Sequence, residues 1–129
     1  MIIPHKYLHS APDSWEALPV TAGLNVNVGT ALTVTGGKLV KAGTTTKPTY
    51  ISMQKATTKE GQSLHVQRVR PETIYETQLS EASASIAVGK KYTLDAAAEK
   101  ITATEASGVA TVVDFDGTEA GSRVRVRFE

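Results

Sequence analysis

The chain lacks several features that would point to a particular class of protein. It has no cysteine, so neither a disulfide framework nor thiolate chemistry is available to it. Aromatic residues make up only 5% of its 129 residues, and no apolar run approaches the roughly 20 residues that a membrane-spanning helix requires. Neither sign of charge dominates, because 14 Lys and Arg residues face 13 Asp and Glu residues. The resulting net charge of +1 argues against a strong field for nucleic acid or for an anionic membrane, and we expect no membrane and no direct nucleic-acid partner.

Threonine, valine and alanine are abundant, and their pattern predicts an all-β protein. In the central stretch, residues 61–77, Leu64 and Val66 alternate with polar residues, as a half-buried strand requires. Val69 then falls on the opposite parity to Leu64 and Val66, and one extra residue in the strand would cause this. The pattern therefore predicts a β-bulge near Gln67 and Arg68. Pro71 lacks a backbone donor and ends the strand, and a second β-rich segment follows at once. A bent strand that leads into another strand favours a small barrel or sandwich.

Short loops predict where some strands pair. Gly36 and Gly37 separate two β-rich runs, and glycine adopts the positive φ of a tight hairpin turn without steric cost. A two-residue loop then sets Val34 opposite Leu39. Residues 95–99 are rich in alanine, which favours a helix by propensity, but a helix this short is marginal on its own. We therefore predict a hairpin loop over residues 95–99.

The last hairpin pairs residues 109–115 with residues 122–128. Valines and a phenylalanine alternate with arginines in its second half, so apolar residues meet on one face and opposite charges on the other. The register that satisfies both faces pairs Val113 with Val126, Phe115 with Val124, Asp114 with Arg125 and Asp116 with Arg123. Because one register serves both faces, the pattern predicts it strongly.

Residues 1–16 are predicted to form an extended N-terminal arm, and residues 17–129 a single β-barrel domain. Pro4 and Pro12 discourage regular structure in the arm. The candidate partner-binding residues are its apolar ones, Ile2, Ile3, Pro4, Tyr7, Leu8 and Trp15. Two interpretations are open: the arm packs along its own domain, or it becomes ordered only against a partner. Its extended backbone, whose polar groups need a partner or water, favours an attachment arm.

No constellation of catalytic residues is apparent. The sequence has no nucleophile elbow, phosphate-binding loop or zinc signature. His5 and His9 have a metal-ligand spacing only on a helix, which the prolines disfavour. Asp114 and Asp116 resemble an acid/base pair, but arginine partners across the hairpin would keep both ionised, so we predict a structural role. We therefore expect no enzyme activity, no cofactor and no bound metal.

The arginines are unevenly distributed. All of them lie in two short stretches, Arg68 and Arg70, then Arg123, Arg125 and Arg127. If the two strands were neighbours, these residues would form a basic stripe, and nucleic-acid binding is one interpretation of it. Such sites usually add exposed aromatic residues for stacking. Ion pairing within the protein or with an acidic partner fits better.

Several segments together resemble the head decoration, or capsid cement, proteins of tailed bacteriophages. The resemblance spans residues 20–129. It rests on four groups of residues: Lys47 to Ile51; Arg68 to Pro71 with Tyr75 to Thr77; Gly89 to Leu94; and Gly117–Thr118 with Gly121 to Phe128. None of them is a chemical motif.

The resemblance implies a small β-barrel or β-tulip domain, usually a homotrimer, on the outer surface of an icosahedral phage head. Its partners would be the major capsid protein, clamped at threefold and quasi-threefold positions, and other copies of itself. The protein would be made in the host cytoplasm and would catalyse nothing. Two alternatives are a small β-barrel nucleic-acid-binding protein and another minor phage component of the tail or connector.

Overall fold

The computed structural model describes residues 1–8 and 14–129, which form twelve strands and no helix. The strands are β1 (Ile3–Tyr7), β2 (Glu16–Pro19), β3 (Asn25–Val26), β4 (Ala31–Thr35), β5 (Lys38–Lys41), β6 (Tyr50–Ser52), β7 (Ala56–Thr57), β8 (Ser63–Arg68), β9 (Thr73–Gln78), β10 (Lys91–Tyr92), β11 (Ala110–Phe115) and β12 (Arg123–Arg127). The predicted all-β class is confirmed. Within the described part of the chain there is no helix that could cross a membrane.

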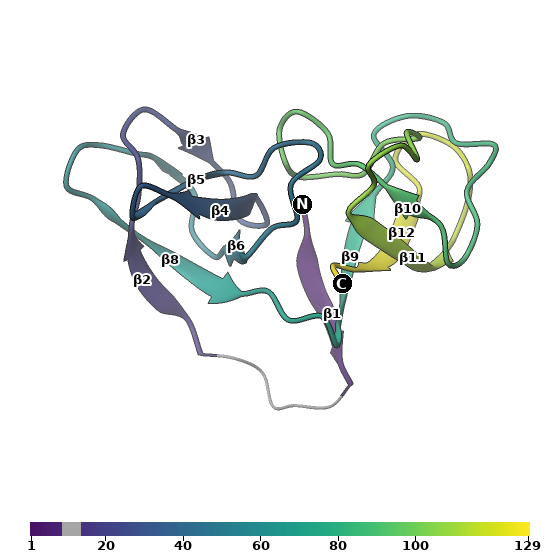
Figure 1. Ribbon diagram of the computed structural model, residues 1–129, viewed down its shortest axis with the longest axis horizontal. Coiled ribbons are helices and arrows are strands. Elements are labelled where there is room, and N and C mark those ends of the chain that lie inside the picture. Colours follow the sequence, from purple (N-terminus) through teal and green to yellow (C-terminus); the bar gives the residue numbers. More distant parts are fainter. Residues whose placement is uncertain (9–13) are drawn as a thin grey trace.

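The strands form two five-stranded antiparallel sheets and one small ribbon (Figure 1). Sheet 1 has the order β1-β9-β12-β11-β10, and sheet 2 has the order β2-β8-β6-β4-β5. The ribbon pairs β3 with β7. The chain passes from sheet 2 to sheet 1 between β8 and β9, where Pro71 was predicted to end one strand before the next begins. Its first strand, β1, lies in sheet 1, whereas β2 lies in sheet 2.

The buried apolar side chains form two clusters, and the larger one joins the sheets, because it holds Ala31 and Ile51 of sheet 2 together with residues of sheet 1. The larger cluster includes Tyr75 and Phe128, whose ring centroids are 5.4 Å apart. The smaller cluster consists of Val20, Val26, Leu32, Leu39, Leu64 and Val66, with Leu18, Leu24, Tyr50 and Ala56 packed against it. The buried apolar side chains alternate along the strands, with Leu64 and Val66 in β8 and Val124 and Val126 in β12.

A closed barrel, which the sequence led us to expect, is not formed by the described residues. Val20 and Leu39 make one parallel bridge, so the ends of β2 and β5 meet and sheet 2 curls. Closure needs a ladder along both edge strands, and a single residue pair does not supply one. The edge strands of sheet 1, β1 and β10, lie at opposite ends of its order.

The short-loop predictions agree with the structure. Gly36 and Gly37 have φ values of +60° and +78°, and Val34 lies opposite Leu39, as predicted. Residues 95–99 form turns and not a helix. The Asp95 side chain accepts hydrogen bonds from the backbone N–H groups of Glu99 and Lys100 at 2.9 and 3.0 Å, which holds this loop.

The last hairpin follows the predicted register in part. Asp114 lies opposite Arg125 and Phe115 opposite Val124, as predicted. Val126, however, lies opposite Val112 and not Val113, because the register shifts between Val112 and Asp114. The shift is a β-bulge, in which one extra residue on β11 has no partner on β12.

The bulge predicted near Arg68 is not found. The register of β8 with β6 is continuous through Arg68, where β8 ends. The reversal of apolar parity therefore comes after the strand and not within it. Gln67, which the alternation placed on the outer face, is buried beside Val66 with only 6% of its surface exposed.

Residues 1–8 differ most from the sequence prediction. They do not form an arm separate from the sheets, because β1 pairs with β9 along the edge of sheet 1. Ile2 is 0% exposed and belongs to the larger core cluster. Its backbone N–H donates to the Gly29 carbonyl at 2.9 Å, which satisfies one of the polar groups that an extended arm leaves open. Pro4 is tolerated because an edge strand needs no donor on its free side.

Candidate partner-binding surfaces

The six predicted partner-binding residues have different environments. Ile2 is buried, Pro4, Tyr7 and Leu8 are half-buried, and Ile3 and Trp15 are 38% and 61% exposed. Ile3 and Trp15 are therefore the ones that offer substantial apolar surface to a partner. Residues 9–13, with His9 and Pro12, lie outside the described residues, and so does the geometry between His5 and His9.

Tyr7 joins the two sheets. Its hydroxyl donates to Gln67 Oε1 at 3.3 Å and accepts from Gln67 Nε2 at 3.1 Å. Tyr7 ends β1 in sheet 1, whereas Gln67 lies on β8 in sheet 2. This contact explains why a glutamine is buried there, since a buried amide needs hydrogen-bond partners.

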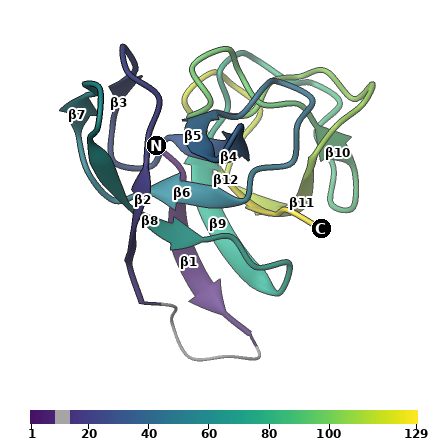
Figure 2. The ribbon, with the colours of Figure 1, turned by 60° about the vertical axis from the view of Figure 1, so that its left-hand side comes forward.

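Trp15 lies just before β2, an edge strand of sheet 2. The end of β1 and the start of β2 reach the same end of the molecule in both ribbon views (Figures 1 and 2). Both are edge strands, so each has backbone donors and acceptors that its own sheet does not use. A large exposed aromatic side chain beside open strand edges is typical of a surface that contacts another chain.

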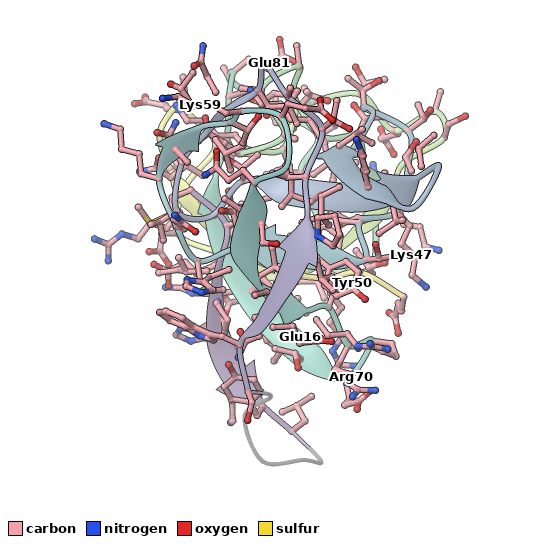
Figure 3. The ribbon with its side chains drawn as sticks, turned by 90° about the vertical axis from the view of Figure 1, so that its left-hand side faces the viewer. Glu16, Lys47, Tyr50, Lys59, Arg70 and Glu81 are labelled. Atoms are coloured by element: carbon pink, nitrogen blue, oxygen red, sulfur yellow. The ribbon has the colours of Figure 1, made fainter. Side chains whose placement is uncertain are left out.

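A second candidate surface is a groove between the two sheets, which we call the basic groove. It has a volume of about 480 Å³ and is lined by Val34, Lys47, Pro48, Thr49, Tyr50, Arg68, Val69, Arg70, Pro71 and Phe128. Figure 3 shows Lys47, Tyr50 and Arg70 on the same side of the molecule, with Glu16 beside them. Of the lining residues that the structure describes, three are cationic and none is acidic.

Contacts within the basic groove organise its aromatic and charged groups. The Arg68 guanidinium lies over the Tyr50 ring, 5.6 Å from its centroid, an attractive cation–π arrangement. Arg68 Nη2 also lies 3.6 Å from Glu16 Oε1 on β2. Phe128 is 0% exposed and forms part of the apolar floor. Sequence reasoning missed this groove as a unit, although it singled out most of its residues in separate segments.

The arginines of β12 take part in a different arrangement on the outer face of sheet 1. Arg125 Nη1 lies 2.6 Å from Asp114 Oδ1 and 2.7 Å from Asp116 Oδ1, and its Nε lies 3.4 Å from Glu76 Oε2. Asp114 thus has its predicted partner. The Asp116 side chain pairs with Arg125, whereas Arg123 Nε lies 3.8 Å from Glu76 Oε1. These contacts support a structural role for both aspartates.

The two arginine groups do not combine into one stripe. Arg68 lies on β8 in sheet 2, whereas Arg123, Arg125 and Arg127 lie on β12 in sheet 1, and the two strands are not paired. Arg125 is surrounded by carboxylates and has a side chain only 18% exposed. The condition for the predicted basic stripe, neighbouring strands, is therefore not met.

Charge in this cluster shifts the proton affinities of its members. The pKa of Asp116 is lowered from its ordinary value because Arg125 donates a hydrogen bond to its carboxylate. The pKa of Arg125 is raised, first by its hydrogen bond to Asp116 and then by the one to Asp114. A carboxyl whose pKa is lower in the folded protein stabilises the fold above its unfolded pKa, and this contribution disappears as the pH falls through the folded value.

The Asp116→Asn substitution should therefore lower the melting temperature near pH 7 by roughly 1–5 °C, the range for an exposed ion pair. As the pH falls through the lowered pKa of Asp116, the wild-type carboxyl becomes neutral like the Asn amide, so the two melting temperatures should converge. Glu119→Gln, which removes an exposed carboxylate from the same hairpin loop, should change little at either pH. An Asp116→Asn effect that is independent of pH would contradict an electrostatic origin.

A scan against models of known protein families, a search of curated proteins and a search of solved structures found no match. The described residues contain no group of three or more His, Cys, Asp or Glu side chains placed to hold a metal ion.

Proposed function

We propose that the protein is a phage capsid decoration protein that binds the outer surface of an icosahedral head and holds neighbouring major capsid subunits together. The proposal rests on the residues that line the basic groove. Every residue lining the basic groove except Val34 belongs to a segment on which the resemblance to decoration proteins rests. Segments that are far apart in the chain thus meet at one accessible surface, as expected of residues that serve a shared partner.

The shape of the molecule also suits a clamp. Three features are available for contact with capsid subunits: the edge strands, the exposed Trp15 and the basic groove. All three are positioned by the two β-sheets. Each such contact is weak by itself, but many copies repeated over a shell act together, and subunits that are bridged at two points separate less readily. Stabilisation of this kind needs no catalytic group.

We propose a homotrimer as the functional unit on the capsid. Sheet 1 ends in the open strands β1 and β10, whereas the edges of sheet 2, β2 and β5, meet at the Val20–Leu39 bridge. Contacts with neighbouring copies would cover such edges, and closed rotational symmetry limits assembly to a defined number of copies. An image of the shell with single, separate copies bound would contradict the trimer.

Co-sedimentation with phage heads tests the proposal. Heads from a strain in which this gene is deleted should bind the purified protein saturably and survive heating better with it than without it. Trp15→Ala should weaken binding about tenfold or more if Trp15 is a central contact. Val88→Ala, which truncates a side chain 66% exposed in a loop, should change binding less than about twofold.

Imaging of complete virions separates the structural alternatives. Density for this chain over the faces of the head would support a decoration protein, whereas density only at the tail or at the portal vertex would favour the tail or connector alternative. Failure to bind heads of the same phage would overturn the proposal.

A further inference from the structure

We propose that the basic groove binds an extended acidic peptide segment of a partner protein. The inference goes beyond capsid attachment as such, because it concerns the chemistry that this groove selects and is tested with peptides in solution. Its basis is the combination of cationic and apolar side chains around a cavity of about 480 Å³. That volume lies within the usual range of roughly 300–1,000 Å³ for binding pockets, and suits a few side chains and not a folded domain.

The walls of the basic groove favour an extended chain with intermittent apolar side chains. Pro48 and Pro71 line it from two different segments, each directly after a cationic residue in the sequence, and Val34 and Val69 add to its apolar lining. Val34 is 46% exposed although it lies in β4, so its side chain is available to a ligand. Grooves of this type bind peptides through side chains placed alternately against apolar walls and charged rims.

The cationic side chains favour carboxylates. Lys47 and Arg68 are both exposed, and they belong to different segments that flank the groove. The chain already places one carboxylate here, since Glu16 lies 3.6 Å from Arg68. The side chains of Arg68 and Glu16 are 47% and 38% exposed, so water weakens their pair, and a carboxylate of a partner can take its place.

A peptide fits this groove better than single-stranded nucleic acid. Nucleic acid without sequence preference is held by bases stacked on exposed aromatic faces. The two aromatic residues of the groove do not offer such faces, because Arg68 lies over the Tyr50 ring and Phe128 is 0% exposed. The net charge of +1 likewise supplies no broad field for a phosphate backbone.

Fluorescence anisotropy with a labelled decapeptide of alternating Glu and Pro tests this proposal. The wild-type protein should bind this peptide with a dissociation constant on the order of 10–100 μM, in the weak range for a small groove. A Gln–Pro decapeptide of the same length should bind at least about tenfold more weakly, because it has no carboxylates. Glu16→Gln should tighten binding of the Glu–Pro peptide about two- to threefold, since it removes a competing carboxylate.

A matched pair of double variants locates the site. Lys47→Glu with Arg68→Glu should weaken binding of the Glu–Pro peptide at least about tenfold. Lys59→Glu with Lys91→Glu makes the same change in net charge at exposed positions outside the groove, and should weaken binding less than about twofold. Lys59 lies well away from Lys47 and Arg70 in Figure 3. If the groove variant fails to fold, Lys47→Gln with Arg68→Gln replaces it with the same expectation of weaker binding.

Four results would overturn the proposal. The first is that the wild-type protein does not bind the Glu–Pro peptide, and the second is that it binds the Gln–Pro peptide equally well. The third is that the two double variants lose the same amount of affinity for the Glu–Pro peptide. The fourth is that the wild-type protein binds a ten-nucleotide oligothymidylate more tightly than the Glu–Pro peptide. The last would identify the basic groove as a nucleic-acid site. Because no head is present in these measurements, a failure here is distinct from a failure to bind capsids.

Discussion

The substitution Val126→Asp is expected to unfold the protein or to lower its melting temperature by more than about 10 °C. Val126 is 0% exposed on β12, where it pairs with Val112 on one side and Tyr75 on the other. A carboxylate at this position would exchange water for the apolar side chains of the larger core cluster. Such a burial typically costs about 4–5 kcal/mol, a large part of the stability of a small domain.

Thermal unfolding followed by circular dichroism measures this effect, with Val88→Asp as the matched control. Val88 is 66% exposed, so the same change in chemistry there should shift the melting temperature by less than about 2 °C. If Val126→Asp has the same melting temperature as the wild-type protein, the two faces of β12 are assigned the wrong way round. The arginines of this strand, and not its valines, would then face the core.

The sequence predicted pairings that depend on short loops and on alternation. The two-residue loop at Gly36 and Gly37 fixed the partner of Val34 because such a turn leaves one register. The pairing of Asp114 with Arg125 was predicted because charge and apolar alternation agreed. Both features act between residues close in sequence, so they can be recognised without knowledge of the whole fold.

The bulges were harder to predict, because a change in parity has more than one structural cause. At Val69 it follows the end of β8 at Arg68, and inside the strand Gln67 turns inward to meet Tyr7 from the other sheet. Between Val112 and Asp114 a real bulge occurs, although the alternation of β12 alone suggested a continuous register. The difference depends on tertiary contacts that local patterns do not contain.

The candidate surfaces were predictable only in part. Trp15 was singled out as an apolar residue that a partner would cover, and its 61% exposure leaves it accessible. The basic groove combines residues 47–50, residues 68–71 and Phe128, which no sequence spacing relates to one another. The burial of Ile2 likewise depends on a pairing between β1 and β9, whose partners are about 70 residues apart in sequence.

The substitution Gly29→Ala tests whether residues 1–8 are part of the folded core. Gly29 has φ +89°, and a Cβ added there would lie 2.7 Å from the Ile2 backbone nitrogen and would also contact Met1 Cγ. An alanine should therefore cost about 1–2 kcal/mol for its backbone conformation. It should cost about 1.5–3 kcal/mol more if Ile2 leaves the core to make room.

Gly23→Ala is the matched control, because Gly23 has a similar φ of +82° and no atom of the described residues lies within 4 Å of the added Cβ. It should show the conformational cost alone, so Gly29→Ala should be the more destabilising of the two by about 1.5 kcal/mol or more in denaturant unfolding. Equal losses in the two variants would mean that the first residues are not held against Gly29 in solution. Residues 1–8 would then behave as the separate attachment arm that the sequence suggested, and their apolar side chains, Ile2 included, would be available to a partner.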